Sequence, residues 1–398
     1  MVDVPELLFA DAWVALPVCG LSTFILIFCW KSNGTDGLSK QRRGEYREGF
    51  LAASLGVNGG VLLTVAWMFA LTTLLNAGLF SAEPPHALPN SSATYQRKVA
   101  SIEFCEPNFL SSAWVAEPMN TISSAIMHPF LGALGVGLGT WRGPSQRRFF
   151  LAYALLFLVG VGSAILHATM LFACQPLDEM PMLYLVVILV YLLIMELEIE
   201  LKLPCNYTEQ LPLILLLLCL VNSVFYLLWQ DFYVCFFVCF GVFAVAVSGL
   251  GIFIALRVQR GLHVRDCGQD EQIAAWSPEE ARLALVRPLF LAAAQCFWIG
   301  VLCWGGEMAW CLNITAMDAR EGWRVAALRT IWQRCLHVLW HSLSALGAYL
   351  VIQACAARRG VSELRRPTLI WWGAPFIVFR DARRAEKVPG SWAAMKTE

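Results

Sequence analysis

The chain has 398 residues, of which 58% are hydrophobic and only 15% are charged, and its mean hydropathy is +0.60. These values exclude an ordinary soluble domain and predict a multi-pass membrane protein. The formal net charge of zero gives no reason to expect nucleic acid as a partner, and no protein partner is predicted. The 14 cysteines form no Cys-x-x-Cys pair, so most are predicted to be small buried side chains.

Nine apolar runs are long enough to cross a bilayer, which requires a helix of ~20 residues. The first run is not a cleavable signal, because Asp3, Glu6 and Asp11 stand where such a peptide carries positive charge. We therefore predict an all-α integral membrane protein with about nine transmembrane helices. The runs lie near residues 9–30, 50–80, 112–141, 149–172, 180–197, 210–229, 232–256, 286–312 and 327–355.

Lysine and arginine residues are distributed unequally between the two sides of these helices. One set of alternating connections, together with the C-terminal tail, holds 22 of them, whereas the other set holds 4. The positive-inside rule therefore predicts a lumenal N-terminus and a cytosolic C-terminus. Glycosylation sequons at Asn90 and Asn313 lie on the predicted lumenal side, but a third at Asn206 lies on the cytosolic side, so they add little. The apolar tail segment 368–379 is too short to span and is expected to be interfacial or folded.

Two segments place histidines within apolar runs. Ser163 and His167 are four residues apart and share one helix face, and Pro176 is expected to break this helix just before Asp178 opens the next. His337 and His341 have the same spacing in the last run. The predicted topology puts all three histidines in the lumenal half, where they can meet across two facing helices.

Three imidazoles at matched depth favour a metal site. A single histidine in a membrane helix is more often a core residue, but His-x-x-x-His is a metal-ligand spacing, and three neutral nitrogens leave the fourth position of a catalytic zinc open. Cys335 points to another part of the helix and is excluded. The remaining histidines have no partner at helical spacing and are expected to be structural or solvated: His86, His128 and His263.

Asp178 and Ser163 are the candidate catalytic side chains beside the zinc ligands. Asp178 is expected to orient or deprotonate a water, although a helix N-cap is the commoner role for such an aspartate. Ser163 is expected to donate a hydrogen bond to an oxyanion, although a serine bonded to its own helix carbonyl is common. No Gly-x-Ser-x-Gly elbow surrounds Ser163, so it is not predicted to be a nucleophile.

A second constellation precedes the run at 112–141. Three carboxylates and an amide gather at one predicted helix start, which suggests neutralisation by a hard cation, and oxygen ligands fit calcium better than zinc. An acidic turn that caps the helix is an equally good explanation. The candidate ligands are Glu103, Glu106, Asn108 and Glu117, with the main-chain carbonyl of Phe104.

Five ordered motifs resemble the alkaline ceramidases, a family of seven-helix intramembrane hydrolases related to the adiponectin receptors. The motifs read EFCEPN from Glu103, AEPMNTIS from Ala116, GVGSAILHATM from Gly160, QPLDEMPM from Gln175 and HVLWHSL from His337. The similarity covers about residues 101–356. It divides the chain into an N-terminal extension with two transmembrane helices (1–100), a seven-helix core (101–356) and a basic cytosolic tail (357–398).

The resemblance implies a zinc- and calcium-dependent amidase that hydrolyses ceramide, a membrane lipid substrate, to a sphingoid base and a fatty acid in the endoplasmic reticulum or Golgi. It implies zinc ligation by His167, His337 and His341, with Ser163 and Asp178 beside them, and calcium ligation by the residues from Glu103 to Glu117 given above. A family segment matched by Trp304, Glu307 and Cys311 implies a lumenal disulfide between Cys105 and Cys311. Glu103 and Phe104 depart from the aspartate and tryptophan usual in the family. The alternatives are a receptor like the adiponectin receptors and an acyl-ester hydrolase of glycerolipids or lipid anchors.

Overall fold

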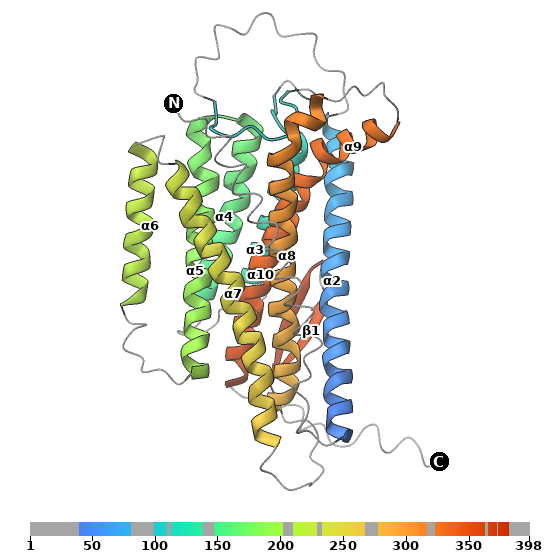
Figure 1. Ribbon diagram of the computed structural model, residues 1–398, viewed down its shortest axis with the longest axis vertical. Coiled ribbons are helices and arrows are strands. Elements are labelled where there is room, and N and C mark those ends of the chain that lie inside the picture. Colours follow the sequence, from blue (N-terminus) through green and yellow to red (C-terminus); the bar gives the residue numbers. More distant parts are fainter. Residues whose placement is uncertain are drawn as a thin grey trace, which may run out of the picture.

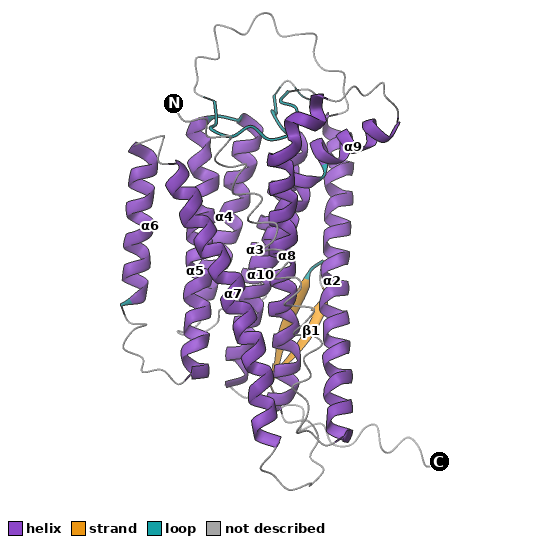
Figure 2. Cartoon of the chain, viewed as in Figure 1, coloured by secondary structure: helices purple, strands orange, loops and turns teal. Residues whose placement is uncertain are grey.

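The computed structural model shows a bundle of long helices that lie side by side, with one two-stranded sheet against it (Figures 1 and 2). The structure describes residues 40–80, 99–109, 112, 114–137, 147–201, 210–228, 233–266, 278–316, 323–362, 365–371 and 373–381. The predicted first run, residues 9–30, lies outside these described residues, as do His86 and Asn90.

The long helices coincide with the other predicted runs. Eight of the nine runs correspond to helices, so the all-α membrane fold is confirmed. The helices are α2 (Lys40–Phe80), α3 (Pro118–Gly137), α4 (Arg147–Thr169), α5 (Gln175–Leu201), α6 (Leu211–Leu228), α7 (Tyr233–Asp266), α8 (Pro278–Ala316), α9 (Trp323–Arg334) and α10 (Leu336–Ser362).

Seven segments of the described chain are long and apolar enough to cross a membrane. They are Ser54–Leu79, Arg147–Thr169, Phe172–Glu198, Leu211–Leu228, Val234–Leu256, Val286–Cys311 and Leu336–Arg358. Helix α3 is not among them, although it has 20 residues and lies within the bundle. Four polar side chains of α3 keep its hydropathy below that of the seven spans, and all four are buried: Asn120, Ser123, Ser124 and His128.

Helix α10 lies at the centre of the bundle. In its apolar span 89% of the residues are buried, whereas in the apolar span of α6 only 17% are buried. Its neighbours include α3, α4, α5 and α8 (Figure 1). Large side chains fill the core between them, including Phe149, Tyr153, Phe290 and Tyr349. The predicted extra helix α2 packs against α3, α8 and α10, so it belongs to the same bundle.

Two predicted boundaries differ from the structure. Helix α4 ends at Thr169, followed by Met170 with φ 49° and a short 3-10 helix, Phe172–Cys174, so the break precedes Pro176, which lies in the first turn of α5. The last run is two helices, because α9 ends at Arg334 and α10 begins at Leu336. Helix α9 carries three arginines and is too polar to continue the span.

The C-terminal segment folds against the helical bundle. Strands β1 (Arg365–Trp371) and β2 (Pro375–Asp381) form an antiparallel hairpin that contacts α2 and α10. The Trp67 indole donates a hydrogen bond to the Gly373 carbonyl at 2.7 Å, and the Gln353 side chain accepts from the Ile377 amide at 3.2 Å. Gln353 also donates to the Tyr153 hydroxyl at 2.7 Å, which links the hairpin to α4. These hydrogen bonds join the hairpin to the helical bundle.

Candidate active site

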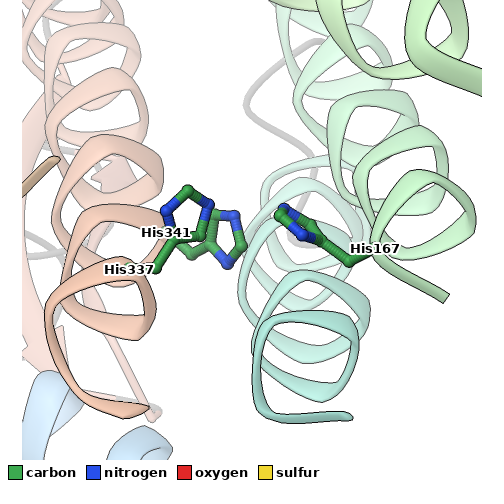
Figure 3. Close-up of side chains that lie close together, drawn as sticks. All are labelled: His167, His337 and His341. Atoms are coloured by element: carbon green, nitrogen blue, oxygen red, sulfur yellow. The ribbon is translucent and has the colours of Figure 1, made fainter. Parts of the chain in front are cut away.

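Three histidines from two helices meet inside the bundle. His167 lies in the last turn of α4, and His337 and His341 lie one turn apart at the start of α10 (Figure 3). All three side chains are buried. One ring nitrogen of each histidine lies within 4.8 Å of a ring nitrogen of the other two. Among the described residues this is the one such group of three or more histidine, cysteine or acidic side chains. The predicted convergence of the three imidazoles is therefore present in the structure.

A separate acceptor lies against the Nδ1 atom of each ring. Nδ1 of His167 is 2.6 Å from Glu117 Oε2, Nδ1 of His337 is 2.6 Å from Glu307 Oε2, and Nδ1 of His341 is 2.8 Å from Ser123 Oγ. Ser124 Oγ lies 3.1 Å from Nδ1 of His341 as well. With Nδ1 occupied in this way, Nε2 is the nitrogen left on each ring for a ligand, and Nε2 of His167 is buried without a partner in the described chain.

This donor set fits a divalent metal ion. A ligating histidine usually donates its second N–H to a carboxylate or a similar acceptor, which sets the ring orientation and increases its basicity. The triad has two carboxylates and a hydroxyl in these positions. Three nitrogens without a fourth protein donor are the open arrangement of a catalytic site rather than a closed structural one.

Glu117 is held against His167 by backbone as well as side chain. The Glu117 amide donates to the His167 carbonyl at 3.0 Å, and the Ala116 amide donates to the Ala168 carbonyl at 2.9 Å. These bonds use carbonyls at the end of α4 that have no partner within the helix. Glu117 also accepts from the Asn120 side chain at 3.0 Å. A residue predicted as a calcium ligand thus contacts a zinc-ligand candidate directly.

Glu307 is a site residue to which the sequence reasoning assigned no role. Its second oxygen accepts from the Cys105 amide at 2.9 Å, so one carboxylate on α8 joins His337 to the segment 99–109. Cys105 also pairs as a disulfide with Cys311, one turn after Glu307 on α8, with Cα atoms 5.5 Å apart. The sequence did contain a signal for Glu307: it precedes Cys311 by four residues, so both side chains lie on one helix face and can contact the segment 99–109.

We expect a Glu307→Gln variant to bind metal at the triad about 10- to 100-fold more weakly. The neutral amide is a weaker acceptor for the Nδ1–H of His337, so the ring loses orientation and basicity. Titration of the purified protein with a chelator, with metal content read by elemental analysis, measures this. Glu198→Gln, an acid-to-amide change on α5, is the matched control. Equal metal affinity in both variants would show that Glu307 does not support the centre.

Asp178 and Ser163 lie beside the triad, where the sequence placed them. Both are buried, and the Ser163 hydroxyl hydrogen-bonds the Asp178 carboxylate while accepting from Ser124 Oγ at 3.0 Å. Asp178 is not a helix N-cap, since it is the fourth residue of α5. Its Oδ1 has no partner in the described chain. Gly162 permits this placement, because a Cβ there would lie 3.0 Å from the Asp178 amide nitrogen and closer still to Leu177.

The predicted calcium ligands differ in burial and in hydrogen-bond partners. Glu106 accepts from the Met119 and Asn120 amides at 2.8 and 2.9 Å and so caps α3, whereas Glu103 and Asn108 are exposed. Burial raises the pKa of Glu106 to about 7, and the two amide donors offset only part of the increase. Glu117 Oε1 and Asn120 Oδ1 remain buried without partners in the described chain. The helix-cap role considered above is therefore present for Glu106.

Phe104 covers the triad. Its ring centroid lies 4.7 Å from that of His167 and 4.4 Å from that of His337. Below these rings a cavity of about 380 Å³ extends between α4, α5, α7, α8 and α10, with Ser163, Asp178, His337 and His341 in its wall. Its wall reaches Val351, fourteen residues after His337 on α10, which corresponds to roughly 21 Å of helix. Leucine, valine and phenylalanine side chains line most of this length, including Leu156, Leu189, Phe240 and Phe290.

The other titratable side chains near the centre occupy different places. His128, expected to be structural, also lines the cavity, with its ring centroid 6.2 Å from that of His341. Cys335 lies at the break between α9 and α10 and does not join the triad. Glu179 is buried beside Asp178 and accepts from Gln175 at 2.9 Å and from the Tyr226 hydroxyl.

Comparison with known proteins agrees with this site. A family model described as Ceramidase matches residues 96–378, most of the chain and all the site residues discussed above. The chain belongs to the ceramidase family. The resemblance drawn from the five motifs is confirmed, and the matched region extends past residue 356 to include most of the β-hairpin of this ceramidase.

Alkaline ceramidases from three kingdoms are similar to this ceramidase. Alkaline ceramidase 3 of Mus musculus is 27% identical over 293 residues, which cover 72% of this chain and 94% of that protein. Alkaline ceramidase YPC1 of Saccharomyces cerevisiae is 32% identical over 102 residues, 25% of this chain and 32% of that protein. An alkaline ceramidase of Arabidopsis thaliana is 31% identical over 94 residues, 24% of this chain and 36% of that protein.

Proposed function

We propose that this ceramidase is a zinc-dependent intramembrane amidase that hydrolyses the N-acyl bond of ceramide to a sphingoid base and a free fatty acid. The observation that carries the proposal is the buried group of His167, His337 and His341 at the head of a long apolar cavity, with Asp178 beside it. A catalytic zinc needs three protein ligands and an open position. A lipid amide needs an apolar channel that ends at the reacting groups.

Zinc held by the three Nε2 atoms would polarise the amide carbonyl and lower the pKa of a water at the centre. Asp178 accepts a proton from the attacking water and delivers it to the amide nitrogen as the C–N bond breaks. The water oxygen forms the new bond to the acyl carbon, so the products are a primary amine and a carboxylic acid. The Ser163 hydroxyl turns from Asp178 to donate to the carbonyl oxygen as it gains negative charge.

The surrounding structure supports this chemistry. Phe104 and the helices around the cavity separate the reacting groups from bulk water, which strengthens the electrostatic interactions of Asp178 with the reacting atoms. The 21 Å of apolar wall, roughly estimated from helical rise, suits an extended hydrocarbon chain. With a hydrocarbon chain along this wall, such a lipid would have its amide, the one polar linkage between two chains, beside the histidines.

A direct assay tests the function. Purified protein in detergent is incubated with labelled ceramide and, separately, with labelled phospholipid, each with and without a zinc chelator. We expect release of a sphingoid base and a fatty acid from ceramide, and loss of this activity with chelator. Hydrolysis of phospholipid in place of ceramide would favour an acyl-ester hydrolase, and turnover of neither lipid would favour a receptor.

We also propose a calcium site formed by Glu103, Glu106, Asn108 and Glu117 with the Phe104 carbonyl, coupled to the zinc centre. Two observations support it: Glu117 Oε1 is buried without a partner in the described chain, and Glu117 Oε2 contacts His167. A cation on Oε1 would compensate the buried charge of Glu117 and hold it against His167. The oxygen donors are those that calcium prefers.

Two variants separate calcium binding from support of the zinc ligand. Glu103→Gln removes an exposed carboxylate with no contact to the triad in the described structure, so it should abolish the calcium response of hydrolysis and leave zinc affinity unchanged. Glu117→Gln should abolish the calcium response and also weaken zinc binding by about 10- to 100-fold. Activity against calcium concentration, together with metal analysis, gives both values. If both variants kept a normal calcium response, the calcium site would be contradicted and these carboxylates would act only as helix caps.

We propose that the metal centre and the Cys105–Cys311 disulfide face the lumen of the endoplasmic reticulum or Golgi, with the C-terminus in the cytosol. The charge count supports this orientation, and the lumen is the oxidising compartment in which a disulfide persists. Glu307 contacts both the Cys105 amide and His337, so the cysteine pair lies beside the histidines. Peptide mapping by mass spectrometry under non-reducing conditions should find the Cys105–Cys311 peptide, and its absence would contradict the pairing.

A further inference from the structure

His128 is a cavity histidine for which the proposed mechanism has no role. It lies on α3, is 5% exposed and borders the cavity. Its ring centroid is 6.2 Å from that of His341. Ser124, which contacts His341, precedes His128 by one helical turn, so His128 lies one turn deeper in the membrane than the metal centre.

One ring nitrogen of His128 has no use within the described protein. Its Nδ1 atom is buried and has no hydrogen-bond partner among the described residues. Such an atom reduces the stability of the fold, and an apolar side chain of similar size would avoid this cost. Buried polar atoms nearly always have a partner, so an unpaired one beside a cavity indicates a ligand.

The surrounding backbone holds His128 against the cavity wall. Gly160 on α4 lies opposite, and a Cβ there would be 2.7 Å from the His128 Cβ and 2.8 Å from the Ser124 carbonyl oxygen. The two helices can therefore approach closely only because residue 160 is glycine. The neighbouring acidic residues already have donors, since Asp178 is bonded to Ser163, and Glu179 to Gln175 and Tyr226.

We propose that His128 binds a substrate hydroxyl group two or three bonds from the scissile amide and makes the enzyme prefer hydroxylated lipids. This inference rests on the proposed function. With the amide carbonyl at the triad, a hydroxyl two or three bonds from the amide is at most roughly 3–4.5 Å away, since each bond spans about 1.5 Å. With a hydrogen bond of about 2.9 Å added, that reach spans the 6.2 Å between the ring centroids of His128 and His341. Two hydroxyls have this chemistry: the 3-hydroxyl of the sphingoid base and the 2-hydroxyl of a hydroxylated acyl chain.

The experiment compares matched lipid pairs in wild type, H128L, H128N and H128Q. One pair is ceramide and 3-deoxyceramide, and the other is 2-hydroxyacyl ceramide and ceramide. We expect wild type to favour the hydroxylated member of one pair by roughly tenfold in kcat/KM, the value of one hydrogen bond, and H128L to bring that ratio close to one. Asparagine places its amide near the position of Nδ1 and glutamine near that of Nε2, so one of them should restore the preference.

Each result has a distinct meaning. The pair whose ratio collapses in H128L identifies the hydroxyl. Unchanged ratios for both pairs, or an equal loss of turnover for all three lipids, would overturn the inference. H128L should melt no lower than wild type, because it removes an unpaired polar atom, and H128M is the second apolar variant if H128L fails to fold.

Binding gives an independent measurement. The increase in melting temperature caused by each lipid should show the same preference without any turnover. If wild type binds the hydroxylated lipid better but hydrolyses neither, the proposed function fails while the inference about His128 stands. If wild type hydrolyses ceramide but H128L keeps the preference by both measurements, the inference alone fails.

Discussion

A His337→Ala variant is expected to lose bound zinc and ceramide hydrolysis together while remaining folded in the membrane. Removal of one of three nitrogens leaves two ligands, too few to hold zinc against water. Because the ion supplies several kcal/mol of transition-state stabilisation, hydrolysis should fall by more than about 10³-fold. Zinc per protein by elemental analysis and fatty acid release from ceramide measure the two effects on the same preparation.

The control for His337→Ala is Cys335→Ala, two residues earlier at the break between α9 and α10. Cys335 is half-buried but lies outside the triad, so its removal should leave zinc content and turnover close to wild type. Size-exclusion elution and melting temperature show whether His337→Ala is folded. Retained turnover in metal-free His337→Ala protein would contradict the zinc mechanism.

An Asp178→Asn variant is expected to keep its zinc and lose about 10²- to 10⁴-fold in kcat. Asparagine has nearly the same shape, so it can still bond Ser163, but it cannot accept a proton from water. The two variants therefore predict different patterns, with loss of metal and activity at His337 and loss of activity alone at Asp178. Single-turnover hydrolysis and zinc analysis distinguish them.

Glu198→Gln, the same acid-to-amide change at a buried position toward the other end of α5, is the control for Asp178→Asn. It should leave kcat unchanged. If Asp178→Asn hydrolysed ceramide at the wild-type rate with zinc bound, another group would have to accept the proton. Loss of zinc from Asp178→Asn would instead show that Asp178 supports the metal centre.

Local pattern was sufficient for much of the site. The spacing of His337 and His341 puts both rings on one face of a helix, whatever that helix packs against. Charge counts placed their ends of α4 and α10 on one side, and the structure has them at one end of the bundle (Figure 1). Asp178 was less certain, because a helix start by itself favours a cap. The position of Asp178 in the first turn of α5, bonded to Ser163, excludes the cap role.

Contacts between residues far apart in the chain could not be predicted from local sequence patterns. Glu307 meets His337 and Cys105 only because α8 packs along α10 and the segment 99–109 crosses over both. His128 has no partner at helical spacing, and its place in the cavity wall depends on the close contact of α3 with Gly160. Segment 368–379 was expected to be interfacial or folded, but the sequence did not show that the hairpin at 365–381 would bond to Trp67 and Gln353 of the bundle.

By itself, the sequence determined the membrane-embedded helical class, the family and the three histidines, because hydropathy, charge asymmetry and helical spacing are properties of one segment at a time. Only the tertiary structure decided which acceptor orients each histidine, that Glu117 faces His167, and that His128 borders the cavity. These contacts join residues far apart in the chain, and they depend on how closely helices approach each other, which no single segment encodes.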